Sequence, residues 1–138
     1  MTQPSGTTEP EAEEGRRLLL VDDDSSVRES MVKFFRRRGF IAESTSERHE
    51  AEALLRNRRY DALIVDLQLT ADHGREGYEV LSFARRVCPG VKTILLTAVR
   101  TTSTDRQGRE SGADVVLDKP QALADLTRTV TRLLEGRS

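Results

Sequence analysis

Four apolar segments of this sequence each end in polar residues that could take part in chemistry. Short apolar runs rich in β-branched residues are typical of strands that are buried on both faces of a parallel sheet. The carboxyl ends of parallel strands meet at one edge of the sheet, and open α/β folds bind their ligands there. The residues that follow these runs are Asp22 and Asp23, Asp66, Thr97, and Lys119.

Three acids gathered at one edge need a counter-charge. Carboxylates a few ångströms apart repel each other by roughly several kcal/mol at an effective dielectric near 20. A hard divalent cation relieves this repulsion, and a sparse set of carboxylates that leaves room for water suits Mg²⁺. Lysine supplies a point charge and threonine a hydroxyl, and both can hold phosphoryl oxygens. The set therefore indicates phosphoryl transfer with Asp66 as nucleophile, since a carboxylate can carry a phosphoryl group as an acyl phosphate.

The elements that would position these residues alternate regularly between strand and helix. Such alternation predicts an α/β fold with one parallel sheet, right-handed crossovers and helices on both faces. We expect strands at residues 16–21, 40–43, 62–65, 91–97 and 113–117, and helices at about 26–38, 46–58, 78–87, 101–111 and 122–134.

The helix boundaries rest on capping signals. Ser26 and Glu29 have the spacing of a capping box, and Ser46 can cap the second helix. Arg36–Arg38 and Gly39 are typical of a helix end, because cations favour the negative pole of the helix and glycine can turn the chain out of it. Apolar residues at helical spacing predict an inward face in the first helix that contains Val27, Met31, Phe34 and Phe35.

The segment 101–111 has the position of a helix but contains no apolar residue. Because the packing of an apolar face normally stabilises such segments, we expect any helix here to be marginal. We hypothesise that the segment is mobile and becomes ordered on phosphorylation or partner binding.

Length and composition limit the classes of protein that this chain can belong to. The 138 residues fit one domain, which we place at 16–138, after a polar, glutamate-rich tail (1–15) that we expect to be disordered. A charged fraction of 33% with a net charge of −1 gives no overall attraction to nucleic acid, so we expect no direct nucleic acid binding. No apolar run approaches the roughly 20 residues of a membrane helix, and the start lacks a signal peptide.

Cysteine and histidine give no sign of a zinc site or a disulfide. Cys88 is the single cysteine, and His49 and His73 lie far apart without suitably spaced partners. A reducing cytoplasm is the compartment that fits best.

Taken together, these motifs resemble the receiver domains of bacterial two-component response regulators over about residues 17–134. The motifs that match in order and spacing are Leu-Leu-Val-Asp22-Asp23, Leu-Ile-Val-Asp66, Ile-Leu-Leu-Thr97-Ala98 and Asp118-Lys119-Pro120.

The resemblance implies a flavodoxin-like (βα)5 sheet of order 2-1-3-4-5 and a site that takes phosphate from a histidine kinase or a histidine phosphotransfer protein. Asp66 would be the phosphoacceptor, and Thr97 and Lys119 would contact the phosphoryl group. Mg²⁺ would be held by Asp23, Asp66 and the backbone carbonyl of Gln68, with Asp22 assisting through water. The resemblance also implies a cis Lys119–Pro120 peptide bond, and the chain would signal through protein contacts as a stand-alone domain, with a weak homodimer possible.

Two features depart from the family pattern. Thr70 replaces the usual proline four residues after the acceptor, and the following loop is about three residues longer than is customary. Val116 occupies the position of the aromatic switch residue, three residues before the lysine. The usual coupling through rotation of a Tyr or Phe is therefore absent.

Two other functions compete with the phosphoacceptor. A degenerate receiver would bind a partner without phosphorylation, which the altered loop and Val116 favour. A phosphatase of the haloacid dehalogenase type would use Asp22 as nucleophile, because Asp22–Ser26 loosely matches that family's first motif. That match is weak, since the chain is short and no paired acids follow Lys119. In the leading interpretation the chain is not an enzyme, beyond phosphotransfer to and hydrolysis from its own aspartate.

Overall fold

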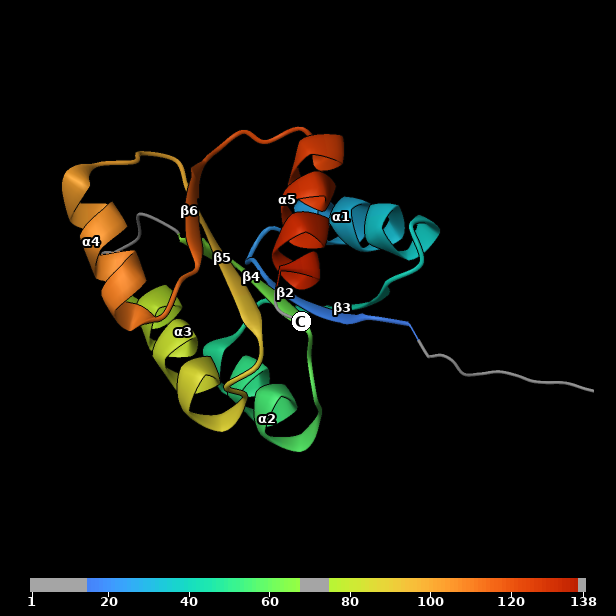
Figure 1. Cartoon of the computed structure of the whole chain (residues 1–138), viewed down its shortest axis with the longest axis horizontal. Helices are drawn as coiled ribbons and strands as arrows, with labels where there is room; N and C mark the ends of the chain where they lie inside the picture. Colours follow the sequence, from blue (N-terminus) through green and yellow to red (C-terminus); the bar gives the residue numbers. More distant parts are fainter. Residues whose placement is uncertain (1–14, 68–74, 137–138) are drawn as a thin grey trace, which may run out of the picture.

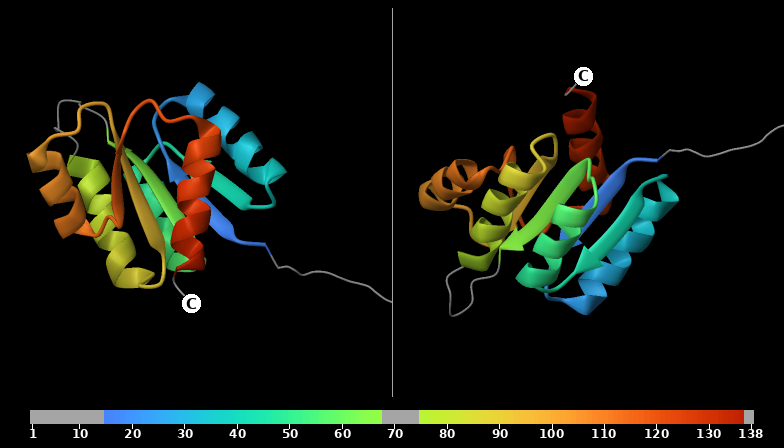
Figure 2. Two further views of the ribbon diagram at one scale, coloured as in Figure 1. Left: turned by 45° about the horizontal axis from the view of Figure 1, so that its top comes forward. Right: turned by 90° about the horizontal axis from the view of Figure 1, so that it is seen from below.

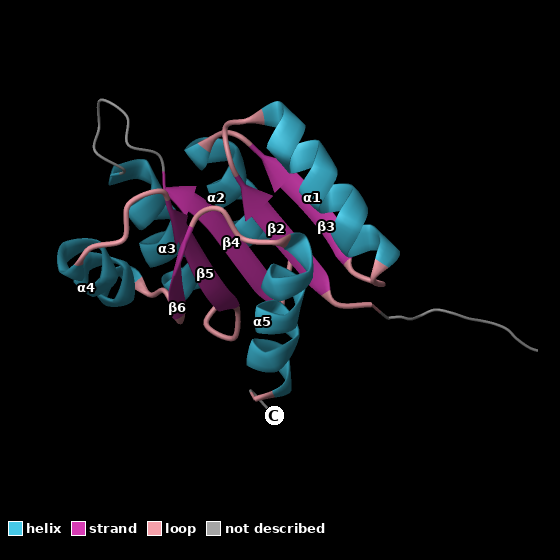
Figure 3. Ribbon diagram, turned by 90° about the horizontal axis from the view of Figure 1, so that it is seen from above, coloured by secondary structure: helices cyan, strands magenta, loops and turns pink. Residues whose placement is uncertain are grey.

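Five parallel strands form one sheet in the computed structural model, which describes residues 15–67 and 75–136. Their order across the sheet is β3-β2-β4-β5-β6, which is the predicted order of second, first, third, fourth and fifth strand (Figure 3). The strand labels begin at β2, and the bounds are β2 (Arg17–Val21), β3 (Ile41–Thr45), β4 (Ala62–Leu67), β5 (Lys92–Thr97) and β6 (Val115–Asp118).

Strand β4 is the centre of the sheet. All six of its residues are buried, including Asp66, because β2 and β5 flank it and helices cover both faces. Asp66 lies opposite Leu96 of β5, and Leu67 lies opposite Thr97. The apolar run therefore ends, as predicted, with an acid at the carboxyl edge of the sheet.

The helices cover the sheet in two layers (Figures 1 and 3). Helices α1 (Ser25–Arg37) and α5 (Leu123–Glu135) pack on one face, where Met31, Phe35, Leu126 and Val130 meet the sheet. Helices α2 (Arg48–Asn57) and α3 (Arg75–Val87) contribute to the core on the other face. Helix α4 (Thr102–Ser111) lies beside α3, near β6 (Figure 2).

Helix α4 is complete although it lacks an apolar face. Its only buried residue is Gly108, where an added Cβ would lie 2.9 Å from Leu95 and 3.0 Å from Val116. The missing side chain lets the helix backbone approach the sheet closely. A capping box between Thr101 and Thr104 begins the helix, and Gly112, with a φ of 119°, ends it. We expected a marginal helix because these contacts cannot be read from the polar sequence. The mobility of the segment stays a prediction.

The predicted N-cap of α1 is wrong by two residues. Asp24, not Ser26, occupies the N-cap, and its carboxylate accepts hydrogen bonds from the backbone N–H groups of Ser26 and Val27. Val27 is 38% exposed and therefore does not belong to the inward face. Phe34 is only half-buried, and the Arg38 guanidinium lies 4.4 Å from the centre of its ring.

The other element boundaries differ from the prediction by at most three residues. Ser46 does not cap α2; the N-cap position is Glu47, which makes no side-chain capping bond. Helix α3 begins at Arg75 rather than Tyr78, and its Val87 is 39% exposed. Predictions that concern the tail up to residue 14, Gln68, Thr70 or His73 lie outside the described residues. In the described ranges, no helix is both long and apolar enough to cross a membrane.

Candidate functional site

A buried carboxylate and a lysine face each other at the carboxyl edge of the sheet. Asp66, which is 8% exposed, ends the apolar run of β4, and Lys119 follows β6. The Lys119 ammonium lies 2.8 Å from each carboxylate oxygen of Asp66. The backbone N–H of Lys119 donates to the carbonyl of Thr97 at 2.8 Å, and the Lys119–Pro120 peptide bond is cis, as predicted. The sheet therefore brings together two residues that are 53 positions apart in the chain.

Asp22 is the second buried acid of the site. It is 2% exposed and follows β2, the strand next to β4. Burial and the adjacent Asp66 carboxylate raise the pKa of Asp22 to about 7, although the backbone N–H of Asp24, 2.9 Å from Oδ1, and the charge of Lys119 act in the opposite direction. Two carboxylates in one buried place thus compete for the single ammonium group.

These two acids supply part of what a hard divalent cation requires. Their mutual repulsion is the type of charge imbalance that a cation such as Mg²⁺ relieves, and carboxylate oxygens are ligands it prefers. The third acid, Asp23, is exposed, and Gln68 lies outside the described residues. Among residues 15–67 and 75–136, no three His, Cys, Asp or Glu side chains are grouped so that they could hold a metal. The residues fit a site that the third acid or the neighbouring loop would complete.

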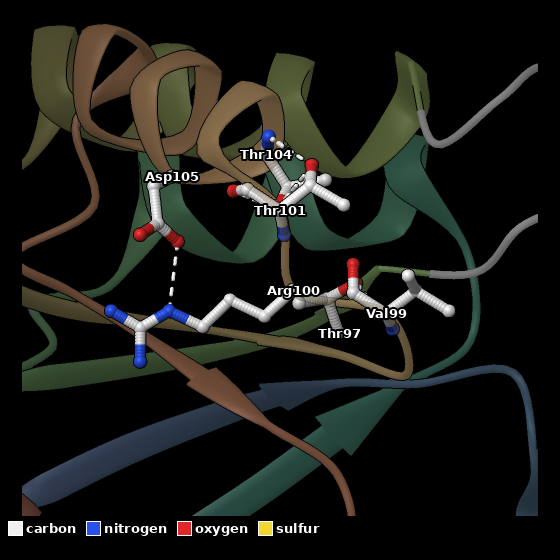
Figure 4. Close-up of polar contacts among 6 residues, drawn as sticks. All are labelled: Thr97, Val99, Arg100, Thr101, Thr104 and Asp105. Atoms are coloured by element: carbon white, nitrogen blue, oxygen red, sulfur yellow. Dashed lines mark hydrogen bonds and ion pairs between the residues drawn. The ribbon is translucent and has the colours of Figure 1, made fainter.

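Thr97 lies at the end of β5, but its hydroxyl is engaged by its own loop. Thr97 Oγ1 donates to the carbonyl of Val99 at 3.2 Å and accepts from the Val99 N–H at 3.3 Å. Figure 4 shows these two residues together with the start of α4, where Arg100 Nε donates to Asp105 Oδ1 at 2.9 Å. Within the described chain, the Thr97 hydroxyl makes no hydrogen bond to the side chain of Asp66 or Lys119, and only the Thr97 carbonyl is bonded to the Lys119 backbone N–H. The threonine is thus near the predicted place, with its hydroxyl turned to the backbone.

An open groove of about 430 Å³ leads away from the acids between α1 and α5. Asp22, Asp66 and Lys119 line its polar end. Most of the other lining side chains are apolar, among them Val27, Met31, Leu96, Leu123 and Leu126. The Val27 side chain is exposed because it lines this groove and is not part of the core.

Sequence reasoning missed two residues that shape the site. The Arg28 guanidinium donates to the backbone carbonyl of Asp22 at 2.8 Å and so fixes the turn that carries the acids. Asp24 caps α1 and also donates its N–H to Asp22. An Asp before two serines is a common N-cap, so that signal was present; nothing in the sequence indicates that Arg28 folds back onto Asp22.

Comparisons with known proteins agree with this arrangement. A family model described as response regulator receiver domain matches residues 18–131. The response regulator MprA of Mycobacterium sp. (strain KMS) is 34% identical over 122 residues, which are 88% of this chain and 52% of that protein. MprA of Mycolicibacterium vanbaalenii is 33% identical over 86% of this chain and 50% of its own length. The chain therefore spans about half the length of the curated relatives it matches.

Solved structures show the same fold. A CheY-like receiver domain protein from Methanospirillum hungatei JF-1 superposes with a TM-score of 0.81 at 25% identity and covers 89% of this chain and 96% of its own. A response regulator from Burkholderia pseudomallei, solved with a phosphorylated aspartic acid, a calcium ion and citrate, superposes with a TM-score of 0.75 at 20% identity, over 89% of this chain and 73% of its own.

Proposed function

The chain belongs to the family of response regulator receiver domains, and from this premise we propose that it accepts a phosphoryl group on Asp66 and signals through protein contacts. The donor would be the phosphohistidine of a histidine kinase or of a histidine phosphotransfer protein. In the transfer, a carboxylate oxygen of Asp66 forms a bond to phosphorus while the bond from phosphorus to the histidine nitrogen breaks. The product is an acyl phosphate on the domain itself.

The observation that carries this proposal is the contact between Asp66 and Lys119. The Asp66 carboxylate is buried, and the Lys119 ammonium lies 2.8 Å from each of its oxygens, which orients the carboxylate at the carboxyl edge of the sheet. The same ammonium can move to the new phosphoryl oxygens as negative charge passes from the carboxylate to them. Thr97, at the end of the adjacent strand, would donate its hydroxyl to those oxygens once it leaves the Val99 carbonyl.

We propose that Mg²⁺ is the cofactor of this reaction. Asp23, Asp66 and the backbone carbonyl of Gln68 would hold it, with Asp22 assisting through water. When bound, the ion supplies positive charge that offsets the negative charge of the incoming phosphoryl group. Arg28 and Asp24 then have a supporting role, because their hydrogen bonds to Asp22 fix the turn that presents Asp22 and Asp23.

The phosphodonor would dock along the groove between α1 and α5. That groove ends at Asp66 and exposes apolar side chains such as Val27, which suits the apolar face of a partner helix. We further propose that the chain acts in the cytoplasm, where such kinases deliver their phosphate. A stand-alone organisation, a weak homodimer and the absence of direct nucleic acid binding stay predictions from the sequence.

The proposal is tested by intact-mass analysis after incubation with acetyl phosphate and Mg²⁺. We expect a single phosphoryl adduct on the wild-type chain and none on Asp66→Asn or after EDTA treatment. Asp23→Asn serves as a matched variant that keeps the acceptor and should slow adduct formation without moving its site.

The degenerate receiver gives the opposite result in this experiment. If neither acetyl phosphate nor a cognate kinase produced an adduct, the chain would be a binding module that retains the acidic pocket without its chemistry. The dehalogenase-type alternative has no support in the family match, and Lys119 contacts Asp66 rather than its proposed nucleophile, Asp22.

A further inference from the structure

A second groove lies at the end of the sheet opposite to Asp66. Its volume is about 850 Å³. The residues that line it lie near the starts of β2, β4 and β5 and near the ends of α2 and α5. We call it the basal groove and define it by the four arginines on its walls, Arg16, Arg56, Arg58 and Arg59, and by three buried residues of its floor, Leu55, Tyr60 and Cys88.

The basal groove carries an excess of positive charge. Its four arginines face two acids, Asp61 and Glu135, and one carboxylate oxygen of Asp61 already accepts a hydrogen bond from the backbone N–H of Arg17. The groove therefore favours an anionic occupant.

Two of the four arginines have internal contacts. Arg58 forms an ion pair with Glu43, and the Arg56 guanidinium lies 5.1 Å from the centre of the Phe83 ring. Among the described residues, the structure shows no ion pair and no side-chain hydrogen bond for Arg16 or Arg59. Arg56 lies at the end of α2, where its positive charge complements the helix dipole. Arg16 and Arg59 lie outside any helix and have no such role. These two side chains are therefore free to bind a ligand.

An acidic segment adjoins the groove in the same chain. Residues 9–14 contain Glu9, Glu11, Glu13 and Glu14, and residues 1–14 contain no lysine or arginine. The segment ends two residues before Arg16, whose carbonyl is fixed at the start of β2 by the N–H of Ile41 at 2.8 Å. Six extended residues reach about 20 Å, and attachment to the same chain gives an effective concentration on the order of millimolar.

We propose that residues 9–14 dock by ion pairing onto the basal groove of the same chain. The segment has too few apolar residues to fold alone, so the interaction is electrostatic and depends on the free guanidinium groups of Arg16 and Arg59. The phosphoacceptor site lies at the opposite edge of the sheet and stays open.

Paramagnetic NMR tests this proposal on the full chain. A nitroxide is attached to the cysteine of Ala12→Cys, in a background in which Cys88→Ser removes the single natural thiol. Serine retains the size of the Cys88 side chain and can keep its hydrogen bond to the Tyr60 carbonyl. At low salt we expect the amide signals of Arg59, Tyr60 and Gly90 to lose most of their intensity. The signals should recover at about 1 M salt, where the screening length is about 3 Å.

Charge variants give the decisive comparison. Glu→Gln at the four glutamates, or Arg16→Gln with Arg59→Gln, should restore the groove signals at low salt. Arg37→Gln removes an exposed arginine at the end of α1, outside the groove, and should leave the signal loss unchanged. The proposal is overturned if the wild-type chain shows no loss, or if the loss persists in the Glu→Gln variant.

Mixing distinguishes the chain's own segment from a second copy. If isotope-labelled chains lose the same signals when they are mixed with separate spin-labelled chains, a neighbouring copy occupies the groove and the proposal is wrong. All charge variants should accept phosphate as the wild type does, because none touches the Asp66 site. A failure of docking is therefore distinguishable from a failure of the proposed function.

Discussion

At the scale of single residues, the buried carboxylates of Asp22 and Asp66 compete for the single ammonium group of Lys119. Lys119 contacts both oxygens of Asp66, which leaves Asp22 buried beside a negative charge with only the N–H of Asp24 and the more distant lysine to stabilise its ionised form. The raised pKa of Asp22 is the consequence. The fold thus stores an unfavourable interaction at the place where we propose that Mg²⁺ binds.

This imbalance predicts how stability depends on pH without metal. The folded state holds a proton on Asp22 up to about pH 7, whereas the unfolded chain releases it near the ordinary value of 3.8. The contribution of Asp22 is therefore complete below about pH 4 and is lost as the pH rises to about 7. Asp22→Asn should remove this loss and stabilise the metal-free protein at pH 8 by about 1–3 kcal/mol.

Urea unfolding at pH 5 and pH 8 measures the effect. Asp23→Asn is the matched control, because Asp23 is exposed and its substitution should change the free energy of unfolding little. Equal responses of the two variants at pH 8 would contradict the account of Asp22.

The N-cap of α1 gives a second prediction at this scale. Asp24→Ala removes a side chain that accepts from two backbone N–H groups, and it should cost about 1 kcal/mol of stability. Ser26→Ala should cost little, since the Ser26 side chain is exposed and does not cap the helix. Thermal unfolding of the two variants decides between the observed cap and the one expected from the sequence.

At the scale of elements, α4 is held by its ends and by a close approach rather than by an apolar face. Its capping box and its left-handed C-terminal glycine satisfy the terminal backbone groups, and Gly108 brings the helix against Leu95 and Val116. This explains why the segment can be helical without a single apolar side chain. It also gives Val116 a packing role at the position of the family's aromatic residue.

Gly108→Ala should therefore destabilise the protein, although alanine favours helices. The new Cβ would lie 2.9 Å from Leu95 and 3.0 Å from Val116, both buried. Overpacking of about 1–3 kcal/mol outweighs a gain in helix propensity of about 1 kcal/mol.

Two further variants control this prediction. Gly90→Ala, where an added Cβ meets nothing within 4 Å, should be neutral in urea unfolding. Val116→Ala should lessen the cost of Gly108→Ala, because it removes one of the clashing groups. A stabilising effect of Gly108→Ala would mean that the approach of α4 is not fixed by the glycine.

The sequence predicted the elements better than their boundaries. Apolar runs such as the one before Asp66 identified the strands in the middle of the sheet, because burial on both faces leaves a strong signal. The edge strand β3 is only partly buried and was placed by its position between two helices. Capping was predicted less well, since Asp24, Ser25 and Ser26 are all chemically suited to the N-cap and only the path of the chain selects one. The docking of α4 through Gly108 could not be foreseen, because a glycine in a polar segment has several possible meanings.

At the scale of the whole molecule, the parallel sheet separates two ends with different electrostatics. The carboxyl ends of the strands gather Asp22, Asp66 and Lys119, and the amino ends border the arginine-lined basal groove. The polar residues at the strand ends could be assigned to one edge from the sequence alone. Their contacts could not, since the pairing of Lys119 with Asp66 and the orientation of the Thr97 hydroxyl depend on loop conformation.

Metal binding should therefore stabilise the whole fold. At pH 8, Mg²⁺ at a hundredfold excess over its Kd should add about 2.7 kcal/mol, which corresponds to a rise in Tm of roughly 5–10 °C. The rise should be strongly reduced in Asp22→Asn and Asp66→Asn and should be reversed by EDTA. An equal rise in Tm in all variants would mean that the ion binds at another site.

The central claim is that Asp66 carries the phosphoryl group, and the most direct test locates that group in the chain. Borohydride reduces an aspartyl phosphate to homoserine, so mass-spectrometric sequencing after treatment with acetyl phosphate and Mg²⁺ identifies the modified residue. We predict homoserine at position 66 and aspartate at positions 22 and 23. Homoserine at position 22, or at no position despite an adduct in the intact mass, would contradict the account.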